Sequence, residues 1–267
     1  MIRYARVYRA QCRTTITIQL QYRVALVIWL IGLVLQPVIY LVVWSTVASS
    51  SGGSVGGYHR SDFAAYFIIL MLVNHLTFSW VIYGMDARIR QGSFSPLLLR
   101  PVHPIHADIS ENVTYKLLTF VVMIPATIVL ALVFRPTLHP QPWAVVAFLP
   151  ALTLAFALRF LVEWTISMVA FWISRMSAID QMYYVALLFL SGQVAPLSLF
   201  PAPVRVVASA LPFRWMVSFP VELLLGRLSL TAALQGFAIQ GAWIVAASGV
   251  FMVIWRKGIA RYSAVGT

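Results

Sequence analysis

Charged residues and cysteine are scarce in this chain of 267 residues. Only 10% of the residues are charged, whereas soluble domains carry about 25%. Several uninterrupted apolar runs reach the length of about 20 residues that crosses a bilayer. This composition excludes a water-soluble fold and predicts an all-α polytopic membrane protein. The one cysteine, Cys12, excludes an internal disulfide and implies no metal or redox motif.

The motifs of several enzyme classes are also missing. The sequence has no GxxxxGK[ST] loop, and neither of its lysines, Lys116 and Lys257, follows a phosphate-binding loop. It has no Gly-x-Ser-x-Gly elbow and no His-Glu-x-x-His helix. His103, His106 and Asp108 favour a solvated loop over a metal site, because a proline separates the histidines and no further ligand is evident. We therefore expect no catalytic residue, metal or cofactor on this chain.

What the chain does have is 61% hydrophobic residues, with a mean hydropathy of +0.88. Six membrane spans are predicted at residues 24–47, 63–83, 115–134, 143–173, 182–200 and 233–255. No second, soluble domain is predicted from the loops.

Basic residues outnumber acidic ones by nineteen to seven. In a soluble protein this excess would suggest nucleic acid, but here most basic residues lie in loops and report topology, so no nucleic-acid partner is expected. With the N-terminus in the cytoplasm, thirteen of the nineteen lie inside and five outside. The pattern predicts a multi-pass protein of the bacterial inner membrane with both termini cytoplasmic.

The first 23 residues are predicted to form an amphipathic helix at the inner interface. Its two sides carry different residues, namely Arg3, Arg6, Arg9 and Arg13 on one and Tyr4, Val7, Tyr8 and Cys12 on the other. Such a helix lies in the interface with its arginines toward anionic headgroups. A solvated basic tail is the alternative interpretation.

The apolar stretch at residues 182–226 is too long for one span and too broken for two. Five prolines interrupt it: Pro196, Pro201, Pro203, Pro212 and Pro220. Each removes a backbone donor, and freed backbone groups in hydrocarbon need protein or water partners. We therefore predict that residues 201–226 form a re-entrant helical hairpin on the outer side. A seventh full span would place the basic C-terminal tail outside, against the charge rule.

Ionisable and polar residues within the predicted spans are candidate pathway residues. Arg159 and Glu163, four residues apart, share a helical face, and we favour a structural ion pair over a substrate or proton contact. The other candidates are Gln36, Asn74, His75 and Gln193. For each of these, hydrogen bonding between helices is the alternative to lining a pathway.

The loop at residues 84–114 mixes charges with a triplet of leucines, which an isolated cytoplasmic loop would not normally display. Its segment 89–102 reads IRQGSFSPLLLRPV, residues 170–174 read AFWIS, and residues 211–226 hold LPF and FP-x-ELLLG. In the order and spacing of these motifs, nearly the whole chain resembles the membrane subunits of ABC-2 type transporters, in the branch of about 260 residues.

This resemblance implies an exporter of two permeases and a dimer of cytoplasmic ABC ATPases, with ATP and Mg on the ATPase. It favours a heterodimer of permeases over a homodimer. The implied ATPase-coupling residues are Asp86, Arg88, Arg90, Gly92, Leu97, Leu98, Arg100 and Pro101, with a second contact at Arg175 and Asp180. Anchoring to lipid headgroups is the alternative role for the arginines.

The resemblance also implies that the outer hairpin is a gate. The candidate gate residues are Pro212, Phe213, Trp215, Pro220 and Glu222. Large aromatic side chains suit an interfacial plug, and Glu222 is expected either to pair with Arg214 or Arg227 or to be exposed at headgroup level.

Two other function classes stay open. An integral membrane enzyme acting on lipid would need a coherent set of acid, base, nucleophile or metal ligands, which the sequence does not offer. A secondary transporter would show inverted repeats and broken helices in both halves, and only the C-terminal half is visibly broken in sequence.

Overall fold

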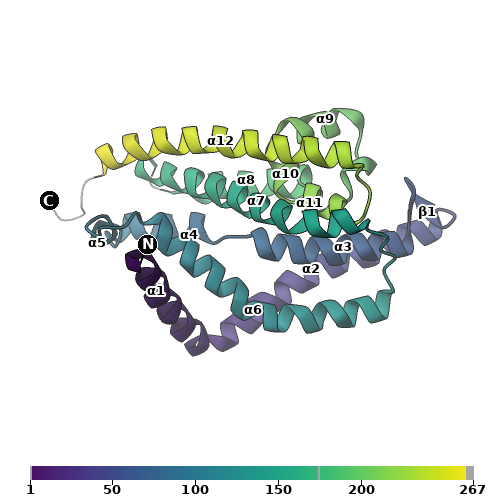
Figure 1. Ribbon diagram of the computed structural model, residues 1–267, viewed down its shortest axis with the longest axis horizontal. Helices are drawn as coiled ribbons and strands as arrows, with labels where there is room; N and C mark the ends of the chain where they lie inside the picture. The colour runs from purple at the N-terminus through teal and green to yellow at the C-terminus, as the bar shows by residue number, and fades with distance from the viewer. Residues whose placement is uncertain (1, 174, 263–267) are drawn as a thin grey trace.

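The computed structural model describes residues 2–173 and 175–262, which are mainly helical (Figure 1). Within this part of the chain, five stretches are long and apolar enough to cross a membrane: Val27–Ser50, Arg60–Arg90, Ile105–Phe134, Pro142–Phe171 and Leu230–Arg261. Many apolar side chains on them face outward; Val146 is 78% exposed, Val121 73% and Leu132 72%. An apolar outer surface of this extent fits lipid rather than water.

The amphipathic N-terminal helix is confirmed as α1 (Ile2–Gln21). Arg6, Arg9 and Arg13 are exposed, while Tyr8 and Cys12 are half-buried against α6 (Ile105–Phe134). The side chains of Arg3 and Tyr4 lie outside the described residues. After a turn, α2 (Arg23–Ser50) follows and packs along α3 (Arg60–Thr77).

The second predicted span is broken in the structure. Helix α3 (Arg60–Thr77) ends before Phe78, and α4 (Val81–Arg90) begins after Trp80. The predicted span at residues 63–83 therefore lies within the apolar stretch Arg60–Arg90, but it consists of two helices rather than one. No proline or glycine lies at residues 78–80. The break is instead stabilised by a tertiary contact, in which the Lys116 ammonium donates a hydrogen bond of 2.7 Å to the Phe78 carbonyl oxygen.

Helix α6 begins at Ile105, ten residues before the predicted start of the third span. Its first half carries Asp108, Asn112 and Lys116, four residues apart, and all three are buried on the side that faces the bundle. Hydropathy alone reads such a polar face as loop. Figure 1 shows α6 bent within its length, and Pro125 inside the helix is the physical cause.

The fourth span matches α7 (Pro142–Ser167), which continues as η1 (Met168–Phe171). The fifth differs from the prediction of residues 182–200. Helix α8 (Ser177–Leu190) has 14 residues, about 21 Å at 1.5 Å per residue, and is too short to cross a bilayer core of roughly 30 Å alone.

Gly192 is the reason that α8 ends where it does. This residue has φ +83°, a conformation that side chains rarely adopt. Its carbonyl oxygen accepts a hydrogen bond of 2.7 Å from the Tyr66 hydroxyl of α3. The chain then turns and forms η2 (Leu197–Leu199).

The two ends of the molecule hold different elements (Figure 1). The start of α1, the short α5 (Ser95–Leu98) and the end of α12 (Leu230–Arg261) lie toward one end of the long axis, which we call the α5 end. The small hairpin of β1 (Ser54–Val55) and β2 (Tyr58–His59) lies at the other, the β end. Because α7 and α12 both run toward the α5 end, α8 carries the chain back.

At the β end, the stretch predicted to be a hairpin of short helices consists of three: α9 (Ala202–Ala210), α10 (Phe213–Met216) and α11 (Ser218–Leu224). Pro201 and Pro212 directly precede two of them, where a missing N–H costs nothing. Helix α11 is mostly buried and packs on α7 and α3.

Candidate functional site

A cavity of about 310 Å³ lies between α2, α3, α7 and the region of α8. It brings together four of the six predicted pathway residues, each from a different part of the chain: Gln36, Asn74, Arg159 and Gln193. Phe78 and Gln193 also line it, so both interruptions of helical structure, at residues 78–80 and after α8, face the same space.

Arg159 is held in this cavity wall by hydrogen bonds from three directions. Its Nη1 donates to Asn74 Oδ1 over 2.8 Å and to Thr77 Oγ1 over 3.0 Å. Its Nε donates to Glu163 Oε1 over 2.9 Å, so the predicted ion pair is present. The Arg159 side chain is 1% exposed and that of Glu163 is fully buried. A buried pair with this many partners fixes the geometry of α7 against α3.

Glu163 has further partners, and sequence reasoning missed them. Its carboxylate accepts from the Tyr183 hydroxyl of α8 over 3.0 Å and from the Ser79 hydroxyl in the break between α3 and α4. The ion pair therefore joins α7, α8 and the broken helix in one network. Only the spacing of Arg159 and Glu163 was visible in the sequence.

His75 and Lys116 lie on the other side of α3, toward α6. The His75 Nε2 and the Thr119 hydroxyl share a hydrogen bond of 2.8 Å. The Lys116 ammonium lies 4.6 Å from the centre of the Phe156 ring and bonds the Phe78 carbonyl. His75 is thus not among the residues that line the cavity. Lys116 was not a candidate, although its spacing from Asp108 and Asn112 was the available signal.

A second cavity, of about 540 Å³, lies between α4 and the start of α8. Its lining includes Asp86, Arg90 and Asp180. The cavity therefore lies between the two segments predicted to couple to an ATPase. Arg90 and Asp86 form an ion pair of 2.7 Å. Gln181 and Tyr184 line both this cavity and the first. We call these two adjoining cavities, which share two lining residues on α8, the α8 groove.

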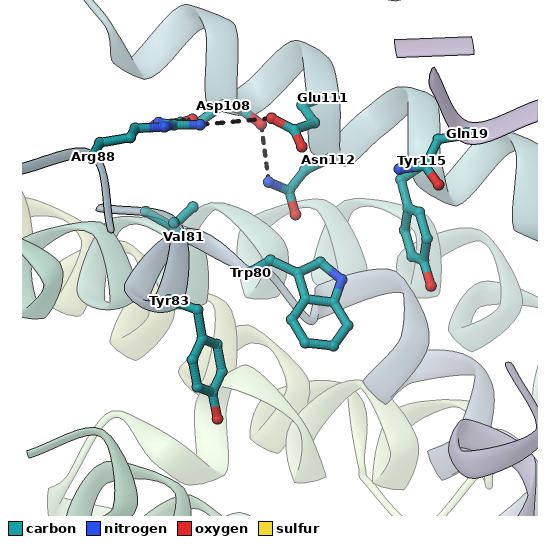
Figure 2. A pocket seen from close by; sticks show the side chains of 10 residues that line it. Gln19, Trp80, Val81, Tyr83, Arg88, Asp108, Glu111, Asn112 and Tyr115 are labelled. Carbon is teal, nitrogen blue, oxygen red and sulfur yellow. Dashed lines mark hydrogen bonds and ion pairs between the residues drawn. The ribbon is translucent and has the colours of Figure 1, made fainter. Parts of the chain in front are cut away.

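A third, smaller cavity, of about 280 Å³, lies between α1, α4 and α6, and its lining residues are drawn in Figure 2. Arg88 reaches across it to Asp108, with 2.6 Å between Nη1 and Oδ1, and its other terminal nitrogen lies 3.7 Å from Glu111. Asp108 also accepts from the Trp164 indole over 2.8 Å. Arg88, which was expected to be available to a partner, is therefore engaged inside the chain.

A family model described as "ABC-2 family transporter protein" matches residues 33–266. This chain belongs to the ABC-2 transporter family. No curated protein and no solved structure matches it. The match runs from within α2 to past the end of α12, so it includes the whole α8 groove of this ABC-2 membrane protein. Membership implies association with ABC ATPases in general.

In this ABC-2 protein, the leucine triplet is divided between core and surface. Leu97 and Leu98 are half-buried against the aromatic cluster around Phe94, which is fully buried. Leu99 is 87% exposed, and Arg100 and Pro101 beside it are exposed as well. The exposed tip consists of Leu99, Arg100 and Pro101, and we call it the α5 tip.

The α5 tip is attached to the end of the last helix. Gly92, with φ +71°, turns the chain after α4, and the Phe94 ring packs edge-on against Tyr262 with centroids 5.6 Å apart. The Ser95 and Tyr262 hydroxyls share a hydrogen bond of 2.8 Å. Arg175, the other predicted contact, is exposed; its neighbour Ser174 lies outside the described residues.

The candidate gate residues of the ABC-2 protein are packed inward rather than displayed at the surface. Pro220 is buried, Trp215 is 6% exposed, and Pro212 precedes α10. The Phe213 ring lies against Tyr183, with centroids 6.0 Å apart. Glu222 pairs with Arg214 over 3.0 Å, one of the two pairings expected from sequence.

The histidines near Asp108 have separate neighbours. His103 accepts a hydrogen bond of 3.2 Å from the Ile105 amide at Nδ1 and lies over Trp255, with ring centroids 4.2 Å apart. His106 shares a hydrogen bond of 2.8 Å with the Tyr8 hydroxyl of α1.

Proposed function

We propose that this chain is the permease of an ATP-driven ABC-2 exporter and that its substrate moves along the α8 groove. Convergence of polar side chains from separate helices on one cavity, between two interrupted helices, carries this proposal. Irregular backbone at membrane depth is tolerated where it is buried in protein or lines a water-filled cavity. The network of Arg159, Glu163 and Tyr183 then links the groove to α10 through Phe213.

A second permease closes the groove in this proposal. Gln36 and Gln181 are exposed on its walls, and polar amides facing lipid beside a buried guanidinium would be costly. A facing protein surface with water between the two removes that cost. We expect a different permease rather than a second copy. Each permease crosses the membrane six times in this proposal, the fifth crossing being α8 together with the turn and η2 that follow it, and α9, α10 and α11 re-enter from the outer side as a gate.

The cytoplasmic ATPase docks at the α5 tip in this proposal. Leu99, Arg100 and Pro101 are exposed together on a segment anchored by Phe94, and such an apolar and basic tip suits contact with a protein. The packing of the Phe94 ring against Phe171 of η1 and against Tyr262 would transmit movement into the bundle. ATP and Mg belong to the ATPase. The membrane is the bacterial inner membrane, with the α5 end in the cytoplasm.

Co-purification of the partner ATPase tests the docking surface. Leu99→Asp and Arg100→Glu should each lower ATPase recovery at least tenfold, because a buried contact or ion pair is replaced by an unpaired charge. Arg256→Glu is the matched control, since Arg256 is exposed near the end of α12. Full ATPase recovery with both α5-tip variants, or equal loss with the control, would contradict the proposal.

A secondary transporter is the second candidate, because interruptions occur in both halves of the chain, at residues 78–80 and 191–196. Family membership favours the ATP-driven exporter. The chain alone, reconstituted in liposomes with a pH-sensitive dye inside, separates the two. Proton entry under an imposed gradient would favour the secondary transporter, and the absence of proton entry would favour the exporter.

A further inference from the structure

A cavity of about 450 Å³ at the β end lies outside the α8 groove. It is walled by β2, η2, α9, α10, α11 and the turn that follows α11. Three arginines line it against a single carboxylate: Arg205, Arg214, Arg227 and Glu222. Its volume lies in the range of small-molecule sites.

Two of the arginines are partly used by the fold. Arg214 donates to Glu222 over 3.0 Å and to the Ser209 hydroxyl over 2.9 Å, while its buried Nε has no partner within the described part of the chain. Arg227 lies 3.6 Å above the Tyr58 ring. Its nearest carboxylate is that of Asp62, at 3.8 Å.

At 3.8 Å, Asp62 is too far from Arg227 to accept a hydrogen bond from it, and its carboxylate oxygens instead accept from the His59 amide over 2.9 Å and from the Thr137 hydroxyl over 3.3 Å. Arg205 is exposed on α9 and forms no ion pair within residues 2–173 and 175–262. In the cavity, Glu222 thus neutralises Arg214, whereas the guanidiniums of Arg205 and Arg227 keep N–H donors available for a ligand.

The remaining polar group points to the same ligand chemistry. The Tyr58 hydroxyl accepts from Ser198 over 3.4 Å, so its own hydrogen is free to be donated. Burial raises the pKa of Tyr58 above its ordinary value, which keeps the phenol protonated. Guanidiniums and a phenol suit an oxyanion, because planar N–H pairs bind phosphate or carboxylate oxygens in bidentate fashion.

We propose that this cavity binds an anionic group, a phosphate or a carboxylate, with Arg205 and Arg227 as its direct contacts and Tyr58 as an additional donor. Arg214 positions the wall through Glu222. Two sources supply this chemistry, namely the headgroup of an anionic lipid in the outer leaflet and a soluble phosphate-bearing molecule. The inference rests on the proposed function only in assigning the β end to the outer face.

The test uses the purified full-length chain and needs no ATPase. Inorganic phosphate and glycerol phosphate are titrated by calorimetry in detergent, and phosphatidylglycerol is compared with phosphatidylcholine in nanodiscs by native mass spectrometry. Arg205→Ala should weaken anion binding at least tenfold, since a charge-assisted contact is lost. Arg205→Lys should recover part of it. Neither change removes a partner used by the fold, which an unchanged melting temperature checks.

Arg60→Ala is the matched control. Arg60 is an exposed arginine at the start of α3, at the same end of the molecule, and it does not line the cavity. Its loss should change binding less than twofold. Equal weakening in both variants would reduce the effect to general surface charge and overturn the proposal, as would the absence of binding for every probe.

The probes also separate the two sources. Binding of the soluble phosphates identifies a soluble anion, whereas retention of phosphatidylglycerol alone identifies a lipid headgroup. Failure of ATPase docking at the α5 tip would leave anion binding unchanged. Loss of anion binding would leave ATPase recovery unchanged, so each proposal fails separately.

Discussion

At the scale of single residues, the buried pair of Arg159 and Glu163 dominates the interior. Each charge has several hydrogen-bond partners, and both side chains are almost fully buried. Removing one partner of such a pair leaves the other as an uncompensated buried charge, at about 3–5 kcal/mol. The pair therefore stabilises the fold, even though Arg159 also lines the groove.

Glu163→Gln should lower the melting temperature of the detergent-solubilised protein strongly, because Arg159 then keeps its charge without a counter-ion. The double change Arg159→Met with Glu163→Met should recover part of the loss, since no buried charge is left. Glu111→Gln is the control, because the Glu111 side chain is 54% exposed and comes no closer than 3.7 Å to Arg88, so that its ion pair is weak. A Glu163→Gln variant as stable as this control would contradict the structural role.

His103 should make stability depend on pH. Burial lowers its pKa below the ordinary 6.5, and its Nδ1 is occupied as an acceptor from the Ile105 amide. The folded-state pKa thus lies below the unfolded one. The stability from neutral His103 is present in full above about pH 6.5 and falls as the pH drops below that value.

Melting temperatures measured from pH 8 to pH 5 check this expectation. The wild type should lose more stability below pH 6.5 than His103→Gln does. The exposed His139 is the matched position, and His139→Gln should follow the wild type. Parallel curves for all three proteins would show that His103 does not contribute.

At the scale of elements, interruptions of helices decide where the polar groups meet. The turn after α8 depends on Gly192, where a Cβ atom would lie 2.6 Å from the Tyr66 hydroxyl. The break after α3 depends on Lys116, which bonds the free carbonyl of Phe78. Both interruptions are held by residues far away in sequence, and together they place Phe78 and Gln193 at one cavity.

Gly192→Ala should destabilise the protein by at least about 1–2 kcal/mol, because the residue combines positive φ with a close contact. Gly32→Ala is the matched change, since Gly32 lies within α2 with nothing within 4 Å of its added Cβ. That variant should be neutral or more stable by up to roughly 1 kcal/mol. Denaturation of both variants in detergent measures the difference, and equal effects would refute the account of the turn.

At the scale of the whole molecule, the α8 groove is open on one side and the β end carries a second, basic cavity. The groove walls expose amides, whereas the outer face of α7 exposes valine and leucine. In the proposed arrangement, this difference separates the side that would face the second permease from the sides that would face lipid.

Cysteine crosslinking in membranes checks which side meets the second permease. In a Cys12→Ser background, Gln181→Cys should crosslink to the co-expressed second permease with a short bifunctional thiol reagent when that permease carries a cysteine on its own groove wall. Val146→Cys, at an exposed apolar position of α7, should not. Equal crosslinking at both positions would contradict the proposed arrangement, and the mass of the product distinguishes a heterodimer from a homodimer.

Local patterns in the sequence were sufficient for the membrane class, the amphipathic α1, the short helices of residues 201–226 and the pairing of Arg159 with Glu163. Hydropathy and helical spacing act over a few residues, so these features need no knowledge of distant parts of the chain. The motifs that resemble ABC-2 permeases gave the family, which the match over residues 33–266 confirms.

Tertiary contacts decided the break at residues 78–80, the early start of α6 and the partner of Arg88, whereas the short α8 depends both on Gly192 and on its contact with Tyr66. In each case a polar group is satisfied by a side chain from another helix: Lys116 for the Phe78 carbonyl and Asp108 for Arg88. Hydropathy treats Asp108 and Asn112 as loop residues, because it does not register which side of a helix faces a polar interior. Inside a membrane protein, where every polar group needs a partner, those distant partners determine where helices begin and end.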